Sequence, residues 1–314
     1  MSSAFIFPGQ GSQSVGMMGA FAQQSIVRDT FDEASDVLGY ELWDLIEQGP
    51  EAELNQTEQT QPAMLAAGVA TWRLWTSLGG SLPQRMAGHS LGEYTALVCA
   101  GALSFADAVQ LVAARGRFMQ EAVPAGMGAM AAILMLEDDV VRSLCAENAG
   151  EDVVQAVNFN SPGQVVVAGH KGAVERVIEA AMAAGAKKAV MLPMSVPSHC
   201  DLMKPAAERL AELLAETEIC SPSIKVIQNA DVASVSDPDQ IRDALTRQLY
   251  MPVRWVETIQ AIKATGVEAL YECGPGKVLA GLNRRIEKRM PVHTLISMDD
   301  IEKALKAAST EAGA

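Results

Sequence analysis

The sequence of 314 residues has no apolar run long enough to span a lipid bilayer. Its first residues, Met1–Pro8, lack the basic segment and the long apolar stretch that a secretory signal requires. Hydrophobic residues make up 49% and charged residues 20% of the chain, the balance of an ordinary globular protein. We therefore expect a cytoplasmic protein with no membrane partner.

Cysteine is scarce and scattered. The chain has five cysteines, and none shows a C-x-x-C pair or another spacing typical of zinc ligands. They are Cys99, Cys145, Cys200, Cys220 and Cys273. We expect free thiols in a reducing compartment and no metal site.

Positive charge is also in short supply, because 24 Lys and Arg residues stand against 38 Asp and Glu residues, a net charge of −14. This excludes a nucleic acid as partner, since nucleic acids are bound by basic faces. An anionic substrate or an acidic partner would need a local basic patch. Candidates are Arg284, Arg285, Lys288 and Arg289, and also Lys187, Lys188, Lys204 and Arg209. Solvated helix faces explain each of these cations equally well.

The hydrophobic pattern alternates between strands and helices, which predicts a parallel sheet covered by helices on both faces. A first strand at 4–7 ends in the turn Pro8-Gly9-Gln10-Gly11, and Pro62 is expected in the first turn of a helix. The remaining predicted strands are 85–88, 224–228, 267–272 and 293–298, and the helices are 20–38, 41–48, 62–78, 93–100, 104–120, 201–217, 238–249, 253–265, 274–289 and a short last helix.

A second unit interrupts this pattern. Its predicted order is strand, helix, strand, strand, helix, strand, the βαββαβ arrangement of ferredoxin-like folds. The elements are a strand at 129–135, a helix at 138–149, strands at 153–159 and 164–169 joined by a turn at 160–163, a helix at 171–184 and a strand at 187–194. We expect an inserted subdomain at 124–195, within a discontinuous subdomain formed by 1–123 and 196–314.

The stretch Gly88-His89-Ser90-Leu91-Gly92 reads G-x-S-x-G between a strand and a helix. This is the pattern of a nucleophile elbow, in which a sharp turn exposes the serine hydroxyl. A chance match is the alternative. If the elbow is real, the N–H of Leu91 is the natural first donor to an oxyanion, and the turn Pro8-Gly9-Gln10-Gly11 is the best source of the second.

A serine nucleophile needs a base, and His199 is the best placed of the four histidines. It lies in Val196-Pro197-Ser198-His199-Cys200, where the two predicted subdomains join. His89 is expected to pack or to line the site, whereas His170 and His293 are expected to be exposed. No carboxylate stands out as the third member. Glu93, Asp107 and Asp201 remain open, as does a backbone carbonyl.

Arg115 and Arg117 lie on the predicted helix 104–120. Arg115 follows a small, apolar stretch, so part of its side chain should be buried. A buried guanidinium binds a carboxylate well. That carboxylate is either an internal Asp or Glu or part of a substrate, and the sequence does not distinguish the two.

Taken together, these motifs resemble the malonyl-CoA:acyl carrier protein transacylases of bacterial fatty-acid synthesis, over nearly the whole chain. The motifs are Phe7-Pro8-Gly9-Gln10-Gly11-Ser12-Gln13, Gln59-Thr60-Gln61-Pro62-Ala63, Gly88 to Glu93, Arg115-Gly116-Arg117-Phe118-Met119-Gln120, Asn158-Phe159-Asn160-Ser161-Pro162-Gly163-Gln164, Val196-Pro197-Ser198-His199, Arg247-Gln248-Leu249-Tyr250 and Gly274-Pro275-Gly276. No catalytic position departs from the family pattern.

The resemblance implies an α/β-hydrolase-like core with the inserted ferredoxin-like subdomain, and a role for each site residue. Ser90 would be acylated and His199 would be its base, oriented by the backbone carbonyl of Gln248. Backbone N–H groups of Gln10 and Leu91 would form the oxyanion hole. The remaining two, Arg115 and Gln61, would respectively bind the malonate carboxylate and line the pocket.

The resemblance also implies malonyl-CoA and acyl carrier protein as partners, a monomer, and no cofactor, since the coenzyme A thioester is a substrate. Two other functions remain open. A serine esterase or thioesterase needs the same elbow and base, and only Arg115 and the longer set of motifs argue against it. A non-catalytic subunit that binds the carrier protein would not need an intact Ser90 and His199. The strictness for malonyl over branched malonyl or acetyl groups also stays open.

Overall fold

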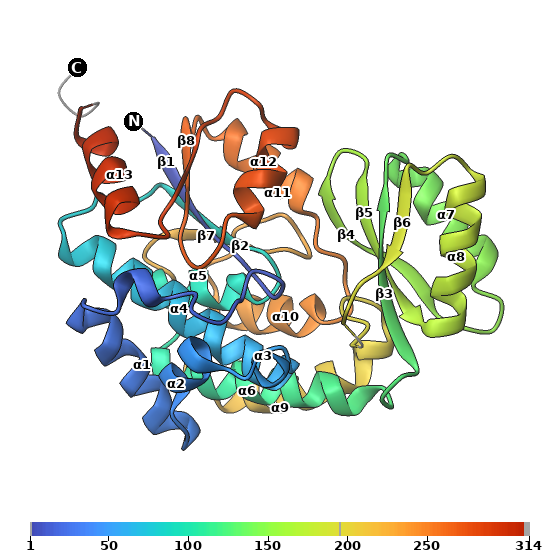
Figure 1. Cartoon of the computed structure of the whole chain (residues 1–314), viewed down its shortest axis with the longest axis horizontal. Coiled ribbons are helices and arrows are strands. Elements are labelled where there is room, and N and C mark those ends of the chain that lie inside the picture. Colours follow the sequence, from blue (N-terminus) through green and yellow to red (C-terminus); the bar gives the residue numbers. More distant parts are fainter. Residues whose placement is uncertain (1, 195, 311–314) are drawn as a thin grey trace.

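A five-stranded parallel sheet with the order β7-β2-β1-β8-β9 forms the centre of the larger part of the molecule in this computed structural model, which describes residues 2–194 and 196–310 (Figure 1). The strands are β1 (Ser3–Phe7), β2 (Arg85–Gly88), β7 (Lys225–Ile227), β8 (Ala269–Glu272) and β9 (Val292–Thr294). Every residue of the central strand β1 is buried. Such a strand requires apolar cover on both faces of the sheet.

Helices provide this cover, and alternate side chains of β1 divide between two cores. Phe5 and Phe7 belong to the core on one face, whereas Ala4 and Ile6 belong to the core on the other. The helices of this part are α1 (Ser25–Leu38), α2 (Leu42–Gln48), α3 (Glu51–Leu54), α4 (Thr57–Ser77), α5 (Gly92–Cys99), α6 (Phe105–Ala122), α9 (Lys204–Glu216), α10 (Pro238–Gln248), α11 (Trp255–Ala264), α12 (Val278–Ile286) and α13 (Met298–Thr310), with 3-10 turns at Gly19–Phe21 and Asp201–Met203.

An antiparallel sheet with the order β4-β5-β3-β6 stands beside the parallel sheet, with helices α7 and α8 packed against it (Figure 1). Its elements follow the predicted order: β3 (Gly128–Leu134), α7 (Asp138–Asn148), β4 (Val154–Ser161), β5 (Gln164–His170), α8 (Lys171–Ala183) and β6 (Lys188–Met191). The fold class expected from the sequence, a parallel α/β core with a separate βαββαβ unit, is confirmed.

Some predicted boundaries are wrong. Helix α4 begins at Thr57 rather than at Pro62, which therefore lies inside the helix and leaves one backbone hydrogen bond unmade. The strand predicted at 293–298 ends at Thr294. Ser297 ends it by capping the next helix, because its hydroxyl accepts a hydrogen bond from the N–H of Asp300 at 3.2 Å.

The two sheets are joined through the backbone of β4. The N–H of Phe159 donates to the carbonyl of Val253 at 3.0 Å, and the N–H of Val253 donates to the carbonyl of Val157 at 2.8 Å. A side-chain contact adds to this, since Arg285 of α12 donates to Gln164 of β5 at 2.8 Å. These contacts fix the antiparallel sheet against the end of the parallel sheet where the candidate site lies.

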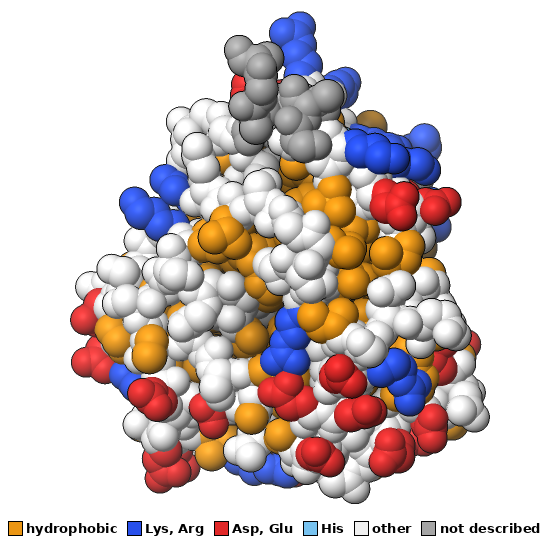
Figure 2. Space-filling view, turned by 90° about the vertical axis from the view of Figure 1, so that its left-hand side faces the viewer, with side chains coloured by type: hydrophobic (Ala, Val, Ile, Leu, Met, Phe, Trp, Pro, Cys, Tyr) orange, Lys and Arg blue, Asp and Glu red, His pale blue; other side chains and the backbone are white. Residues whose placement is uncertain are grey.

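The excess of acidic residues is visible on the surface. Figure 2 shows a face on which Asp and Glu side chains gather in the lower part, with an apolar area above them. Lys and Arg side chains lie at the upper edges and also among the acidic side chains below. Across residues 2–194 and 196–310, no helix combines the length and the apolar character needed to cross a membrane.

Candidate active site

The motif around Ser90 forms a sharp turn between β2 and α5. Ser90 has a φ of 51°, in the left-handed region. A Cβ added at Gly88 would lie 1.8 Å from the carbonyl carbon of Gly92, and one added at Gly92 would lie 2.1 Å from the carbonyl oxygen of Phe7. Only glycine fits at these two positions, so the motif residues are required by the packing of the turn. The turn has the geometry of a nucleophile elbow.

His199 lies beside the serine hydroxyl. Ser90 Oγ and His199 Nε2 are 2.7 Å apart, although the two residues are 109 positions apart in the sequence. His199 Nδ1 lies 2.7 Å from the backbone carbonyl of Gln248. Because a carbonyl only accepts, Nδ1 carries the proton and Nε2 is free to accept the proton of Ser90 Oγ–H.

A backbone carbonyl, and not one of the candidate carboxylates, orients the imidazole of His199. Among the described residues, neither Glu93, Asp107 nor Asp201 is hydrogen-bonded to the ring. Asp107 interacts with Ser104 at the start of α6, and Asp201 pairs with Lys204 at 2.9 Å.

The imidazole of His199 is held in its neutral form. Burial and, second, the positive charge of Arg115 together lower its pKa to about 3, although the hydrogen bond to the carbonyl of Gln248 acts in the opposite direction. A neutral imidazole is what a general base requires at neutral pH.

Arg115, on α6, is buried beside the serine, and its hydrogen-bond acceptors are two side-chain amides and the serine hydroxyl. Its Nη1 donates to Gln61 Oε1 at 2.8 Å, and its Nη2 donates to Gln248 Oε1 at 3.1 Å and to Ser90 Oγ at 3.4 Å. Among the described residues, no carboxylate lies within ion-pair distance of it, so of the two expected partners the internal one is not found. Within the part of the chain that the structure describes, its buried Nε has no hydrogen-bond partner either. A buried cation in this state is suited to bind an anion.

The backbone of the first turn lies directly against the elbow. A Cβ added at Gly9 would lie 2.3 Å from the carbonyl oxygen of His89 and 3.7 Å from the backbone nitrogen of Leu91. The predicted oxyanion donors Gln10 and Leu91 therefore lie on adjoining segments, and both line the cavity that holds the Ser90 side chain.

Two adjoining cavities lie at the elbow. The inner one, of about 40 Å³, is lined by Ser90, His199, Arg115 and Gln61 among others. The outer one, of about 430 Å³, reaches α12 and the antiparallel sheet. The two share the lining residues Gln10, His89, Met130, Asn158 and Met194. The site therefore has a small inner part at Ser90 and a larger outer part beside the antiparallel sheet.

The other histidines lie outside the dyad. His89 lines both cavities, with Nε2 2.8 Å from Asn160 Oδ1, as the expected site-lining role implies. The expectation that His170 and His293 are exposed is wrong, since both are half-buried. His170 Nδ1 accepts a hydrogen bond from the N–H of Val153 at 2.9 Å, and His293 stacks on Tyr271.

The candidate basic residues are exposed, and three of them already have partners. Lys204 pairs with Asp201, Arg209 pairs with Glu121 at 2.5 Å, and Arg285 binds Gln164. Arg117 is also exposed and lies beside the ring of Phe118.

Asn229, just after β7, was not found from the sequence. Its Oδ1 accepts a hydrogen bond from the N–H of Ser90 at 2.7 Å, and its Nδ2 donates to the carbonyl of Gly88 at 2.6 Å. Its own N–H donates to Glu93 Oε2 at 2.9 Å. The available signal was a polar residue at the carboxyl end of a strand of a parallel sheet, which is where ligand sites gather.

The described residues contain neither a metal site nor a disulfide. Within residues 2–194 and 196–310, no group of three or more His, Cys, Asp and Glu side chains is placed to hold a metal ion. The five cysteines are free thiols.

The chain is similar to acyl transferases in both sequence and structure. The family described as "Acyl transferase domain" matches residues 4–307. The chain is 57% identical over 309 residues to the malonyl CoA-acyl carrier protein transacylase of Escherichia coli (strain K12), covering 98% of each chain. It is similar to the solved structure of the malonyl CoA-acyl carrier protein transacylase from Coxiella burnetii, with 51% identity, a TM-score of 0.97, and coverage of 98% of this chain and 97% of that chain.

A second similar structure contains a partner. It is a malonyl-transacylase in complex with its type II PKS acyl-carrier protein, with 52% identity and a TM-score of 0.97, and it covers 98% of this chain and 100% of that chain.

Proposed function

Because this chain belongs to the acyl transferase domain family, we propose that it moves a malonyl group from malonyl-CoA to the pantetheine thiol of acyl carrier protein. The substrates follow from the relatives, whose names state malonyl-CoA and acyl carrier protein. The observation that carries the proposal is the placement of one hydroxyl between a base and a cation. Ser90 Oγ lies 2.7 Å from His199 Nε2 and 3.4 Å from Arg115 Nη2.

The first half of the reaction loads the serine. Ser90 Oγ attacks the thioester carbonyl while His199 Nε2 takes its proton. The tetrahedral oxyanion is held by the backbone N–H groups of Gln10 and Leu91, and each such donor typically lowers the barrier by about 3 kcal/mol. The carbon–sulfur bond then breaks, and His199 returns the proton to the sulfur of coenzyme A. The malonyl group remains as an ester of Ser90.

The second half of the reaction reverses these steps, with the pantetheine thiol of the carrier protein in place of the thiol of coenzyme A. The pantetheine thiol of the carrier protein gives its proton to His199 Nε2 and attacks the malonyl ester. Ser90 Oγ leaves and regains the proton. A Ser–His dyad is sufficient for this cycle, because the carbonyl of Gln248 keeps the imidazole in the required tautomer.

Arg115 selects the acyl group in this proposal. The free carboxylate of malonate matches the fork of the guanidinium, whereas an acetyl group would leave that buried cation without an anion. Gln61 keeps Arg115 directed toward the serine, since the two side chains are joined at 2.8 Å.

We also propose the division of the chain into a core of 1–123 and 196–314 and an inserted subdomain of 124–195. Separate hydrophobic clusters support it: Ile133, Val165 and Val177 belong to a cluster of the antiparallel sheet, and Phe5 and Trp75 to one of the parallel sheet. The monomeric state, the cytoplasmic location and the lack of a cofactor stay predictions from the sequence.

The test is the fate of the malonyl group. Mass spectrometry after brief exposure to malonyl-CoA should find a malonyl ester on Ser90, and none in Ser90→Ala. Adding the carrier protein should then give malonyl carrier protein as the main product. Free malonate as the main product would identify a thioesterase instead, and the absence of any ester in the wild type would refute covalent catalysis.

A further inference from the structure

The turn after β7, residues Asn229–Asp231, binds the elbow from the outside of the cavity. As described above, the side-chain amide of Asn229 bridges the N–H of Ser90 and the carbonyl of Gly88, which lie two residues apart. Asn229 is completely buried. This single amide therefore holds together the backbone on both sides of His89 and fixes Ser90 in its left-handed conformation.

One carboxylate oxygen connects Asn229 to the other side of the site. Glu93 Oε2 accepts hydrogen bonds from the N–H of Asn229 at 2.9 Å and from Gln248 Nε2 at 2.8 Å. Gln248 Nε2 also lies 3.0 Å from the carbonyl of Ser90. Both peptide groups of the nucleophile are thus held by side-chain amides that share Glu93.

The same network reaches the base. The backbone carbonyl of Gln248 is the partner of His199 Nδ1 at 2.7 Å. A displacement of Asn229 relative to Gln248 therefore changes the position of Ser90 relative to His199. The distance that matters is the 2.7 Å between Ser90 Oγ and His199 Nε2.

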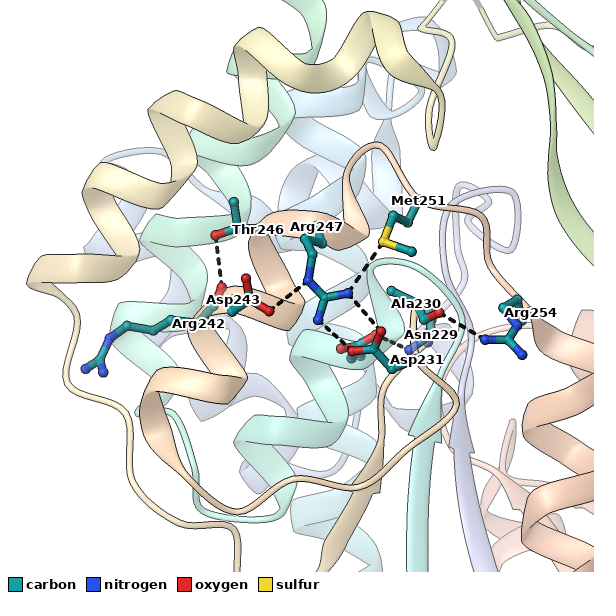
Figure 3. Close-up of polar contacts among 10 residues, drawn as sticks. Asn229, Ala230, Asp231, Arg242, Asp243, Thr246, Arg247, Met251 and Arg254 are labelled. Atoms are coloured by element: carbon teal, nitrogen blue, oxygen red, sulfur yellow. Dashed lines mark hydrogen bonds and ion pairs between the residues drawn. The ribbon is translucent and has the colours of Figure 1, made fainter.

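An ion pair on the outer surface joins the turn to α10 (Figure 3). Arg247, next to Gln248 in the chain, grips Asp231 with two hydrogen bonds of 2.8 and 2.6 Å, and its Nε binds Asp243 at 2.7 Å. On the other side of the turn, Arg254 donates to the carbonyl of Ala230 at 3.4 Å. A two-pronged contact of this kind fixes orientation as well as distance.

We propose that Asn229 is a positioning residue for the acyl transfer, and that the Arg247–Asp231 ion pair holds it in register with Gln248. The inference rests on the proposed function, since it concerns the alignment of that Ser–His dyad. Neither Asp231 nor Arg247 lines the two cavities at the serine. Their effect on the reaction acts through Asn229 and Gln248.

Asn229→Ala tests the inner contact. Removing the amide frees the elbow, and we expect the rate of Ser90 acylation to fall by roughly 10²-fold, the size of effect that a small misplacement of reacting groups produces. The KM for malonyl-CoA should stay within about twofold, because Arg115 and the outer cavity are unchanged. Rates are measured by quenched mass spectrometry and corrected for the folded fraction from thermal melting.

Asp231→Asn tests the outer ion pair without touching buried residues. We expect a fall of about tenfold in the acylation rate with the same unchanged KM. Asp239→Asn is the matched control, since Asp239 also pairs with an arginine of α10, Arg242, at 2.7 Å, but far along the helix from Gln248. It should acylate at the wild-type rate. Arg247→Lys, which keeps the charge but lacks the fork, should resemble Asp231→Asn.

A second readout separates positioning from substrate binding. Diisopropyl fluorophosphate reacts with an activated serine and needs no carboxylate pocket. Its rate with Asn229→Ala and Asp231→Asn should fall by the same factor as acylation by malonyl-CoA. Wild-type rates in both folded variants would overturn the inference while leaving the proposed function intact. A fall in the rate of Asp239→Asn as large as that of Asp231→Asn would also overturn the inference. A wild-type protein that forms no acyl-serine would instead contradict the proposed function itself.

Discussion

The two residues of the proposed dyad share a backbone conformation that only glycine adopts readily. The φ angle is 51° at Ser90 and 66° at His199. Each such residue costs about 1–3 kcal/mol and persists only where its surroundings hold it. Ser90 is held through both of its peptide groups, and the N–H of His199 donates to the carbonyl of Leu249 at 2.9 Å. Four described residues other than glycine have a positive φ, and two of them, Ser90 and His199, form the proposed dyad.

Arg115→Ala tests the selection of the acyl group. Malonyl transfer should fall by about 10²-fold or more, because the malonate carboxylate loses the cation that is proposed to bind it, whereas acetyl transfer should survive or rise. The measurement is the rate of acyl-serine formation from malonyl-CoA and acetyl-CoA. Arg117→Ala removes an exposed arginine of the same helix and should change neither rate. Equal losses with both donors would assign Arg115 a structural role.

The pH dependence of acylation tests the environment of His199. Since burial and the charge of Arg115 lower its pKa to about 3, the imidazole stays neutral as the pH falls from 7 to 5. The rate with acetyl-CoA should therefore show no loss centred near pH 6.5, where an ordinary histidine becomes protonated. In Arg115→Ala the pKa of His199 should rise, and the acid limb of the profile should move to higher pH.

Another group titrates in the same range and must be separated. Burial raises the pKa of Glu93 to about 7. Measuring the pH dependence of the acylation rate in Glu93→Gln as well removes the contribution from the titration of Glu93. If the acylation rate falls to half near pH 6.5 in both the wild type and Glu93→Gln, then His199 becomes protonated like an ordinary histidine, and the structure does not lower its pKa.

Local patterns were enough to select Ser90 and His199, and the structure brings them together. The elbow is recognisable because glycine is required at Gly88 and Gly92. Asn229 has no such pattern around it, because its partners are backbone groups that any sequence supplies. The role of Gln248 came only from the family resemblance, since a backbone carbonyl leaves no trace in residue type.

At the scale of elements, the first turn and the elbow must approach closely, which Gly9→Ala tests. The added methyl group would lie 2.3 Å from the carbonyl oxygen of His89, so the segment carrying Gln10 has to move away from Leu91. We expect kcat to fall by about 10²–10³-fold, the effect of losing one oxyanion donor. The KM for malonyl-CoA should change far less.

Gly281→Ala is the control for this substitution. Gly281 is an exposed residue of α12, and a Cβ there meets nothing within 4 Å. The same change of residue should leave kcat unchanged and raise the free energy of unfolding by up to about 1 kcal/mol. If Gly9→Ala is as active as Gly281→Ala, the proposal that the N–H of Gln10 donates to the oxyanion is contradicted.

Element types were predictable and their ends were not. The order βαββαβ followed from period and turn residues, and it matches the structure. The start of α4 was misplaced, because Pro62 is favoured in a first turn, yet the helix continues through it. Its surroundings decide this, since Pro62 and its neighbours from Thr60 to Thr71 are all buried, and the packing outweighs one lost hydrogen bond.

The whole molecule assembles the site from distant parts of the chain. Ser90 follows β2, Arg115 lies in α6, His199 follows the antiparallel sheet, and Gln248 ends α10. The antiparallel sheet is fixed to the core through β4 and Val253. No local pattern contains such distances, so the residues alone indicated Ser90 and His199, whereas the hydrogen bond from His199 to the carbonyl of Gln248 was expected only from the family resemblance.

Stability of the whole molecule should depend on pH through Glu272, a buried carboxyl group at the end of β8. Its oxygens accept hydrogen bonds from the N–H groups of Leu279 and Ala280 at 2.9 and 2.8 Å, yet burial outweighs these bonds and raises its pKa to about 7. The folded protein therefore binds the proton more tightly than the unfolded chain does, and the stabilisation is complete below pH 4.5 and is lost as the pH rises toward 7.

Glu272→Gln tests this dependence. Between pH 5 and pH 8 the wild type should lose about 2 kcal/mol of unfolding free energy relative to Glu272→Gln, because glutamine has no proton to release. Urea unfolding at the two pH values measures the difference, and only the change with pH matters, since glutamine also loses one hydrogen bond to α12. Glu268→Gln, at an exposed position of the same region, should keep the wild-type dependence. Parallel curves for the wild type and Glu272→Gln would mean that the carboxyl group is already ionised in the folded protein, and that the two N–H groups of α12 outweigh its burial.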